Sequence, residues 1–194
     1  TQNAALSYGG MNNSDILSST EEYNGSSWAS SSNLIFARCY PQGSGDSIST
    51  AFLNGGSTTA GEYIASSNTQ QYNGTAWSIS ANSSTVRTRG LAAGNSTNGL
   101  IAGGCNTPQA PTFTVATEEY NYGTACVGAW STGGNLITGR YWVGGAGTQN
   151  AGLAVAGRAP GPGSTCTEEY NGSSWTAGGA LIYSRFGGGV SGTQ

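Results

Sequence analysis

Short runs of apolar and β-branched residues alternate with polar, turn-forming clusters along the whole chain. Runs of four to eight residues bounded by Gly, Pro, Asn and Ser are typical of β-strands. Between residues 141 and 181 this pattern predicts four strands, at 141–146, 151–156, 167–170 and 174–181. The third run ends at Asn171-Gly172, a dipeptide that tolerates positive φ at both positions and therefore predicts a tight hairpin.

One motif anchors this pattern and recurs four times. Thr-Glu-Glu-Tyr-Asn-Gly-Ser-Ser-Trp occupies residues 20–28 and again 167–175, and Thr-Gln-Gln-Tyr-Asn-Gly-Thr-Ala-Trp occupies 69–77. The remaining copy starts at residue 117 and reaches Trp130 after a four-residue insertion. Successive motif tyrosines are 49, 48 and 50 residues apart. A fixed period of this length indicates a repeat architecture.

Each copy has two further fixed points. An arginine follows each motif tryptophan by ten residues, and a small apolar run ending in a glycine pair precedes each motif, with Ala156 replacing one glycine in the last copy. We therefore assign a structural role in the repeat to Glu22, Tyr23, Trp28, Arg38, Tyr72, Trp77, Arg87, Glu119, Tyr120, Trp130, Arg140, Glu169, Tyr170, Trp175 and Arg185.

The spacing predicts a single domain of four units, at about 1–46, 47–95, 96–147 and 148–194. We expect an all-β fold, a four-bladed β-propeller with four antiparallel strands per blade. Residues 4–9 would form the second strand of one blade and residues 186–191 its first strand, so that pairing the two chain ends closes the ring. Small residues such as Gly144 and Gly145 suit innermost strands, which crowd around the axis.

The glycine pair, the Glu-Tyr or Glu-x-Tyr sequence, the tryptophan about five residues later and the arginine of the next inner strand together resemble the kelch repeat. The likeness covers essentially the whole chain. The acidic-acidic-Tyr-Asn-Gly-Ser-Ser-Trp variant resembles kelch-like repeats of bacteriophage and viral structural proteins and of bacterial surface proteins. Gln70-Gln71, the Ala156-Gly157 pair and the insertion in the third copy depart from the pattern. The kelch fold by itself implies little about function.

Composition narrows the function classes. Only 8% of the residues are charged, the net charge is −3, and no basic run is present. We therefore expect no nucleic-acid partner. No apolar stretch approaches the ~20 residues that span a bilayer, so we expect no membrane insertion. Because the sequence does not begin with Met, we interpret it as a processed product or a segment of something longer.

The four cysteines occupy no shared repeat position. Cys39, Cys105, Cys126 and Cys166 show no Cys-x-x-Cys spacing, and the chain has no histidine, so we predict no metal site and no cofactor. Free, partly buried thiols are the expected state. A bridge between Cys105 and Cys166 at loop ends of adjacent blades stays open as an alternative.

The recurring acidic pairs are better explained as architecture than as catalysts. We predict that one Glu of each pair accepts hydrogen bonds from a repeat arginine, because bidentate Arg–carboxylate geometry suits a partly buried contact between blades. The second copy, with Gln70-Gln71, needs a different contact. Without His or Lys the usual bases for a Ser or Cys nucleophile are missing, so we expect no enzyme and no catalytic residues.

The loops between the second and third strands differ in every copy and are expected to share one rim. Binding residues concentrate in such loops on a rigid frame. The candidate ligand-binding residues there are Asp15, Glu62, Tyr63, Phe113 and Arg158, a set suited to stacking and hydrogen bonding with a sugar or a protein. The alternative is that these loops are spacers without a ligand.

These features favour a non-enzymatic structural or binding module of an extracellular or virion assembly, such as a phage tail, fibre or surface appendage. Its partners would be other structural proteins of that assembly and surface glycans, with host attachment as a role and an oligomer or larger assembly as the expected state. The alternative is a soluble kelch-like adaptor or lectin that binds a protein or a carbohydrate.

Overall fold

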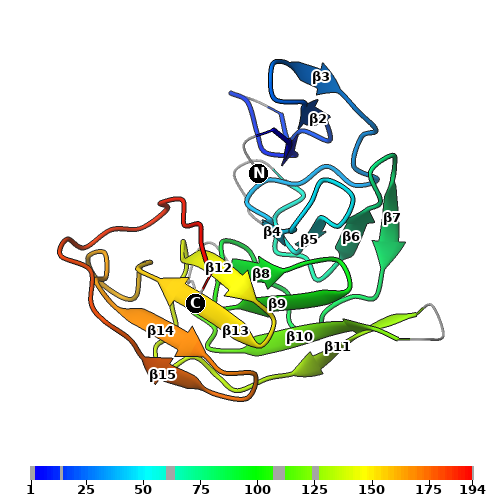
Figure 1. The fold of residues 1–194 in the computed structure, drawn as a ribbon. Helices are drawn as coiled ribbons and strands as arrows, with labels where there is room; N and C mark the ends of the chain where they lie inside the picture. Colours follow the sequence, from blue (N-terminus) through cyan, green and yellow to red (C-terminus); the bar gives the residue numbers. More distant parts are fainter. Residues whose placement is uncertain (1–2, 14, 60–63, 107–111, 124–126, 194) are drawn as a thin grey trace.

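The structure is a computed structural model that describes residues 3–13, 15–59, 64–106, 112–123 and 127–193. Its strands form four antiparallel sheets in chain order, as Figure 1 shows. The first sheet contains β1 (Ala5–Tyr8), β2 (Thr20–Tyr23) and β3 (Trp28–Ser30). The second contains β4 (Gln42–Ser44), β5 (Phe52–Asn54), β6 (Thr69–Tyr72) and β7 (Trp77–Ser80). The third contains β8 (Leu91–Gly94), β9 (Asn98–Ala102), β10 (Thr117–Tyr122) and β11 (Gly128–Thr132), and the fourth contains β12 (Gly144–Thr148), β13 (Ala151–Val155), β14 (Thr167–Tyr170) and β15 (Trp175–Ala177).

The repeat motif builds the outer hairpin of each sheet. In the fourth sheet Tyr170 lies opposite Trp175, and the intervening Asn171 accepts hydrogen bonds through Oδ1 from the backbone N–H groups of Ser173 and Ser174, both at 3.0 Å. Gly172 adopts φ +89°, which explains why the turn needs glycine. Asn24 and Asn73 make the corresponding bonds in the first two sheets.

The strands predicted for residues 141–181 lie close to those observed. The run 167–170 coincides with β14, and 151–156 is one residue longer than β13. The first predicted strand starts three residues before β12, because Trp142 takes a left-handed conformation (φ 56°) that interrupts an extended strand. The last predicted strand is shorter in the structure, where β15 ends at Ala177.

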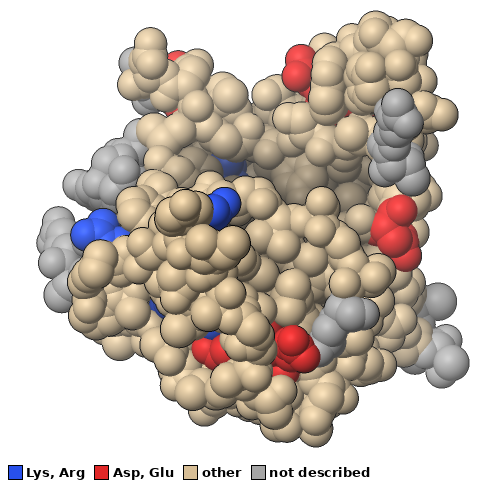
Figure 2. All heavy atoms as spheres, turned by 60° about the vertical axis from the view of Figure 1, so that its left-hand side comes forward, with Lys and Arg blue, Asp and Glu red and all other residues tan. Residues whose placement is uncertain are grey.

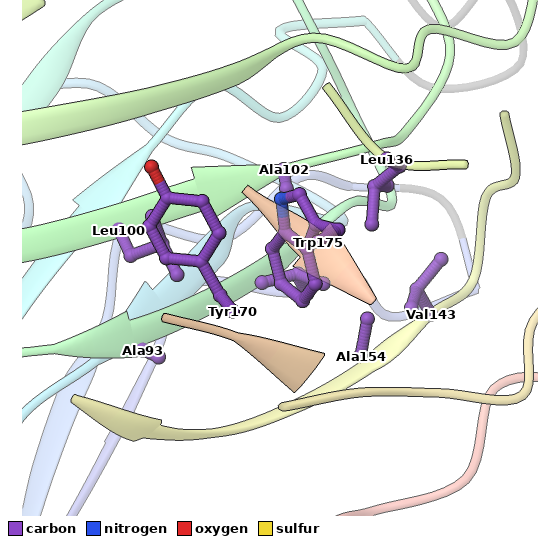
Figure 3. Close-up of a cluster of buried hydrophobic side chains, with 9 residues drawn as sticks. Ala93, Leu100, Ala102, Leu136, Val143, Ala154, Tyr170 and Trp175 are labelled. Atoms are coloured by element: carbon purple, nitrogen blue, oxygen red, sulfur yellow. The ribbon is translucent and has the colours of Figure 1, made fainter. Parts of the chain in front are cut away.

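The hydrophobic core lies between neighbouring sheets. Figure 3 shows Leu100 and Ala102 of the third sheet facing Tyr170 and Trp175 of the fourth. A second cluster joins Tyr8 and Leu6 of the first sheet to Trp77 of the second, and a third joins Phe52 to Ile101 and Trp130. The motif aromatics therefore hold the sheets to one another.

A repeated set of hydrogen bonds accompanies these contacts. The indole Nε1 of Trp77 donates to Thr20 Oγ1 of the preceding sheet at 2.9 Å. Trp130 and Trp175 donate in the same way to Thr69 and Thr117, at 3.0 and 2.9 Å. The three junctions, from the first sheet to the fourth, thus share one tryptophan–threonine hydrogen bond.

The repeat arginines at these three junctions are fully buried. Arg87 pairs with Glu118 at 2.5 Å, and Arg140 pairs with Glu168 at 2.6 Å. The paired carboxylate is the first Glu of each motif, whereas Glu22 and Glu119 accept from the hydroxyls of Tyr72 and Tyr170 on the next sheet. In the second sheet Gln70 replaces the acid, and Arg38 donates to Asn68 at 2.7 Å.

The predicted closure of the ring is wrong for this structure. Residues 186–191 form no strand, and the first sheet has three strands instead of four among the described residues. The C-terminal segment lies beside β12, where Gly147 N donates to Gly192 O and Gly187 N donates to Trp142 O. The strand with which residues 186–191 were expected to pair, β1, pairs only with β2 among the described strands, so this segment has no partner strand. In Figure 1 the first and fourth sheets lie at opposite ends of an open arc.

The described surface carries few charges. Figure 2 shows isolated basic and acidic side chains on a face that is otherwise uncharged. The described residues contain no helix of the length and apolarity that a membrane crossing requires.

Candidate functional site

Four backbone positions of the same kind meet at one end of the inner strands. Tyr40, Arg89, Trp142 and Gly187 each stand two residues after a repeat arginine, and all have positive φ (53°, 59°, 56° and 67°). Arg89 N donates to Tyr40 O, Trp142 N to Arg89 O, and Gly187 N to Trp142 O. Non-glycine residues held at positive φ are strained and cluster at functional sites. Three such residues in contact therefore single out this end of the molecule.

The side chains of these residues form a stack. The Arg89 guanidinium lies over the Tyr40 ring at 4.6 Å and over the Trp142 ring at 5.5 Å. The two rings are 6.4 Å apart and inclined by 24°. Cation–π contact on both sides fixes the arginine and the rings in one arrangement.

More aromatic rings and a second arginine surround the stack. Phe186 meets Trp142 edge to face at 5.5 Å, and the Arg158 guanidinium lies 5.6 Å from the centre of the Phe186 ring. Tyr141 stacks on Phe113 at 5.0 Å with the planes only 3° apart. We call this group the aromatic–arginine cluster: Tyr40, Arg89, Phe113, Tyr141, Trp142, Arg158 and Phe186.

Two adjoining cavities open at the cluster. One of about 310 Å³ is lined by Tyr40, Arg89, Trp142 and neighbouring backbone, and one of about 140 Å³ by Arg89, Trp142, Arg158, Tyr141 and Phe186. Neither lining contains a carboxylate. The indole Nε1 of Trp142 is buried without a hydrogen-bond acceptor among the described residues. Aromatic walls with a few convergent donors are features of small-molecule sites.

Two thiols lie near the stack but are poor nucleophiles. Burial raises the pKa of Cys39 and of Cys105, although the charge of Arg89 opposes the rise in both. Both thiols are therefore protonated at neutral pH. Cys39, Cys105 and Cys166 are free, so the alternative Cys105–Cys166 bridge is not formed, and Cys126 lies outside the described residues. No group of three potential metal ligands occurs in the described part of the chain.

The structure brings together two of the five candidate ligand-binding residues. Phe113 and Arg158 both belong to the cluster. Asp15 is exposed in the loop after Met11, and its backbone N–H donates to Asn12 Oδ1. Met11 itself reaches toward the cluster, because its sulfur accepts from the Tyr40 hydroxyl at 3.3 Å. Glu62 and Tyr63 lie outside the described residues.

The centre of the cluster was missed from the sequence. Tyr40, Arg89 and Trp142 are different residue types, so they do not stand out as a repeated motif. The sequence does place all three of them two residues after a repeat arginine, and this fixed position with varying side chains could have indicated a binding site. Their contact arises only because the inner ends of three sheets meet.

A larger cavity lies elsewhere, at the turns between first and second strands. It measures about 620 Å³ and is lined by small residues and amides, with Asp46 as its charged side chain. Hydrogen bonds from Thr50 and Asn95 lower the pKa of Asp46, so this carboxylate is already engaged in local structure. No aromatic ring lines this cavity. We therefore regard the aromatic–arginine cluster as the candidate site.

Comparison with known proteins supports the fold alone. No protein-family model and no curated protein sequence matches the chain. The fold is similar to that of YjhT. That solved structure, titled "Structure of YjhT", aligns with a TM-score of 0.79 at 12% identity, over 97% of this chain and 71% of the YjhT chain. The similarity supports an all-β, propeller-like arrangement of four antiparallel sheets.

Proposed function

We propose that the chain is a non-enzymatic, kelch-like β-propeller module of an extracellular or virion assembly that attaches to surface glycans through the aromatic–arginine cluster. The cluster is the observation that carries this proposal. The exposed ring of Phe186 and the partly exposed rings of Tyr141 and Trp142 offer stacking surfaces, and the exposed guanidinium of Arg158 offers donors for hydroxyl groups. The four sheets are interpreted as blades, each built on the repeated glycine, tyrosine, tryptophan and arginine positions.

A binding role is better supported than a catalytic one. The chain has no histidine and no lysine, and the two thiols beside the cluster have raised pKa values. The packing of Tyr40, Arg89 and Trp142 against one another fixes the positions of their side chains. These three residues do not place a general base next to a nucleophile, as covalent catalysis requires. A preorganised surface of this kind lowers the entropic cost of binding.

A glycan array tests the binding half of the proposal. We expect the wild-type chain to bind at least one class of glycan and Trp142→Ala to lose at least about tenfold in affinity, equivalent to about 1.4 kcal/mol. Tyr122→Ala is the matched control, because Tyr122 is an exposed aromatic residue that lines neither cavity of the cluster. Its backbone N–H donates to Thr97 O, next to Asn98 of the cavity of about 620 Å³. Arg158→Ala removes an exposed side chain of the cluster and should also weaken binding without unfolding the sheets.

Two results would reject this site: no glycan bound by the wild-type chain, or equal binding by wild type and Trp142→Ala. Detection of the chain in purified virions or on cell surfaces tests the assembly half. Glycan binding by a chain that is never found in such an assembly would favour the soluble lectin instead.

A further inference from the structure

The two ends of the arc expose the same kinds of residue that the internal junctions bury. Trp28 of the first sheet is 50% exposed, whereas its equivalents Trp77 and Trp175 are each 6% exposed. Arg185 is exposed, whereas the other three arginines that follow a motif tryptophan by ten residues, Arg38, Arg87 and Arg140, are at most 1% exposed. Glu21 is exposed, whereas Glu118 and Glu168 at the same motif position are buried.

The internal junctions show what these exposed residues lack. In the third sheet Glu118 pairs with Arg87 and accepts from the backbone N–H groups of Ser84 and Thr85. In the fourth sheet Glu168 pairs with Arg140 and accepts in the same way from Ile137 and Thr138. By position, the corresponding partners of Glu21 are Arg185, Ile182 and Tyr183.

The C-terminal segment already has the backbone arrangement of a junction. Leu181 N donates to Thr165 O and Gly157 N donates to Arg185 O. Leu136 N and Gly104 N make the same bonds, to Val115 O and Arg140 O, in the preceding unit. Ile182 and Tyr183 are nonetheless 89% and 72% exposed. One half of a fourth junction is therefore formed and presented to solvent.

We propose that this half binds the exposed first sheet of a second copy of the chain. The last-sheet face (Thr167, Ile182, Tyr183 and Arg185) of one copy meets the first-sheet face (Glu21, Tyr23 and Trp28) of the next. Arg185 pairs with Glu21, and Trp28 donates to Thr167 as Trp175 donates to Thr117. The same approach places residues 186–191 along β1, which pairs only with β2 among the described strands.

A second copy fits these faces better than the opposite end of the same chain. The three internal junctions share the tryptophan–threonine hydrogen bond, and with all three packed in this way the last sheet does not reach the first (Figure 1). Closing the arc within one chain requires all three packed junctions to shift together, and packed interfaces resist continuous deformation. A second copy fills both faces and leaves the internal junctions unchanged. The association is head to tail.

Charge reversal tests this pairing in the full chain. Sedimentation from about 1 µM to about 1 mM should show a mass that rises above that of one chain. Glu21→Arg alone and Arg185→Glu alone should each abolish the rise, and the double variant should restore it. Asp15→Lys, which changes an exposed charge in a loop outside both faces, is the control and should associate like the wild type.

A mixture of the two single variants provides the sharpest comparison. The faces of the Glu21→Arg chain carry charges opposite to those of the Arg185→Glu chain, so the equimolar mixture should associate although each variant alone stays monomeric. Thermal unfolding of each single variant checks that it is folded. A single-chain mass for the wild type at every concentration would overturn the proposal, as would a mixture that stays monomeric. Neither result bears on glycan binding by the aromatic–arginine cluster.

Discussion

At the scale of single residues, the buried Arg87–Glu118 pair shows how one unit of the repeat differs from another. Glu118 also accepts from Ser84 and Thr85, so its charge is compensated on several sides. In the second sheet Gln70 accepts from the N–H groups of Ile35 and Phe36, and Asn68 accepts from Arg38. The second unit thus keeps the buried arginine and replaces the carboxylate with two amides.

This comparison predicts the behaviour of Glu118→Gln. The variant leaves Arg87 buried without a counter-charge and should lose about 3–5 kcal/mol in the free energy of unfolding. Adding Ala116→Asn, which reproduces the Asn68 position, should recover part of the loss. Urea denaturation measures both variants. A double variant no more stable than Glu118→Gln would contradict the equivalence of the two sites.

The same carboxylate predicts a loss of stability in acid. Burial alone raises the pKa of Glu118, but the N–H of Ser84, the charge of Arg87 and the Ser84 hydroxyl together lower it below 4.5. As the pH falls, the unfolded chain therefore protonates at this carboxylate before the folded chain does. The stabilisation from Glu118 is present above pH 4.5 and is lost as the pH falls through the lower pKa of the folded state. The stability difference between wild type and Glu118→Gln should shrink over this range. A difference independent of pH down to pH 2 would contradict the lowered pKa.

The hydroxyl group of Tyr170 should limit stability at alkaline pH. Burial, the hydrogen bond to Glu119 and the charge of Glu119 raise its pKa to about 12. The folded chain retains a proton that the unfolded chain loses near pH 10, so stability is complete below pH 10 and falls between about 10 and 12. Tyr170→Phe should flatten this part of the stability curve, as measured by denaturation at alkaline pH. An unchanged alkaline slope would contradict the role of Tyr170.

At the scale of elements, the outer hairpin was the most predictable part of the fold. Tyrosine, asparagine, glycine and tryptophan at fixed spacing act locally, and β14 begins and ends where the motif predicts. Residues 186–191 were mispredicted because their place was inferred from closure, and glycine content does not decide the outcome, since the equally glycine-rich β12 pairs with β13. Ala156 shows the reverse: it occupies the glycine position of the other units with φ 58°, so the turn persists without glycine.

The junction between neighbouring sheets predicts different costs for equivalent tryptophans. Trp77→Ala empties a packed position against Tyr8 and Tyr72 and should cost about 3–5 kcal/mol. Trp28→Ala removes a half-exposed side chain and should cost much less in a dilute sample. Guanidinium denaturation at low protein concentration compares them. Equal losses would show that Trp28 is buried in the isolated chain.

For the whole molecule, the sequence predicted four antiparallel sheets, as the structure shows, but its prediction of a closed ring is wrong (Figure 1). Spacing counts the units, whereas the angle at each junction depends on side-chain packing that a repeat period does not encode. The candidate site was only partly predictable for the same reason. Phe113 and Arg158 were recognisable in variable loops, but the stack of Tyr40, Arg89 and Trp142 exists only because three sheets converge.

One tryptophan–threonine contact joins the four sheets at three junctions, and no fourth junction forms within the described part of the chain. Hydroxyl-radical footprinting of a dilute sample, read by mass spectrometry at each tryptophan, tests this arrangement most directly. We expect fast oxidation of Trp28 and strong protection of Trp77 and Trp175, in line with their exposure of 50%, 6% and 6%. Protection of Trp28 equal to that of Trp77 and Trp175 in the dilute, monomeric chain would contradict it.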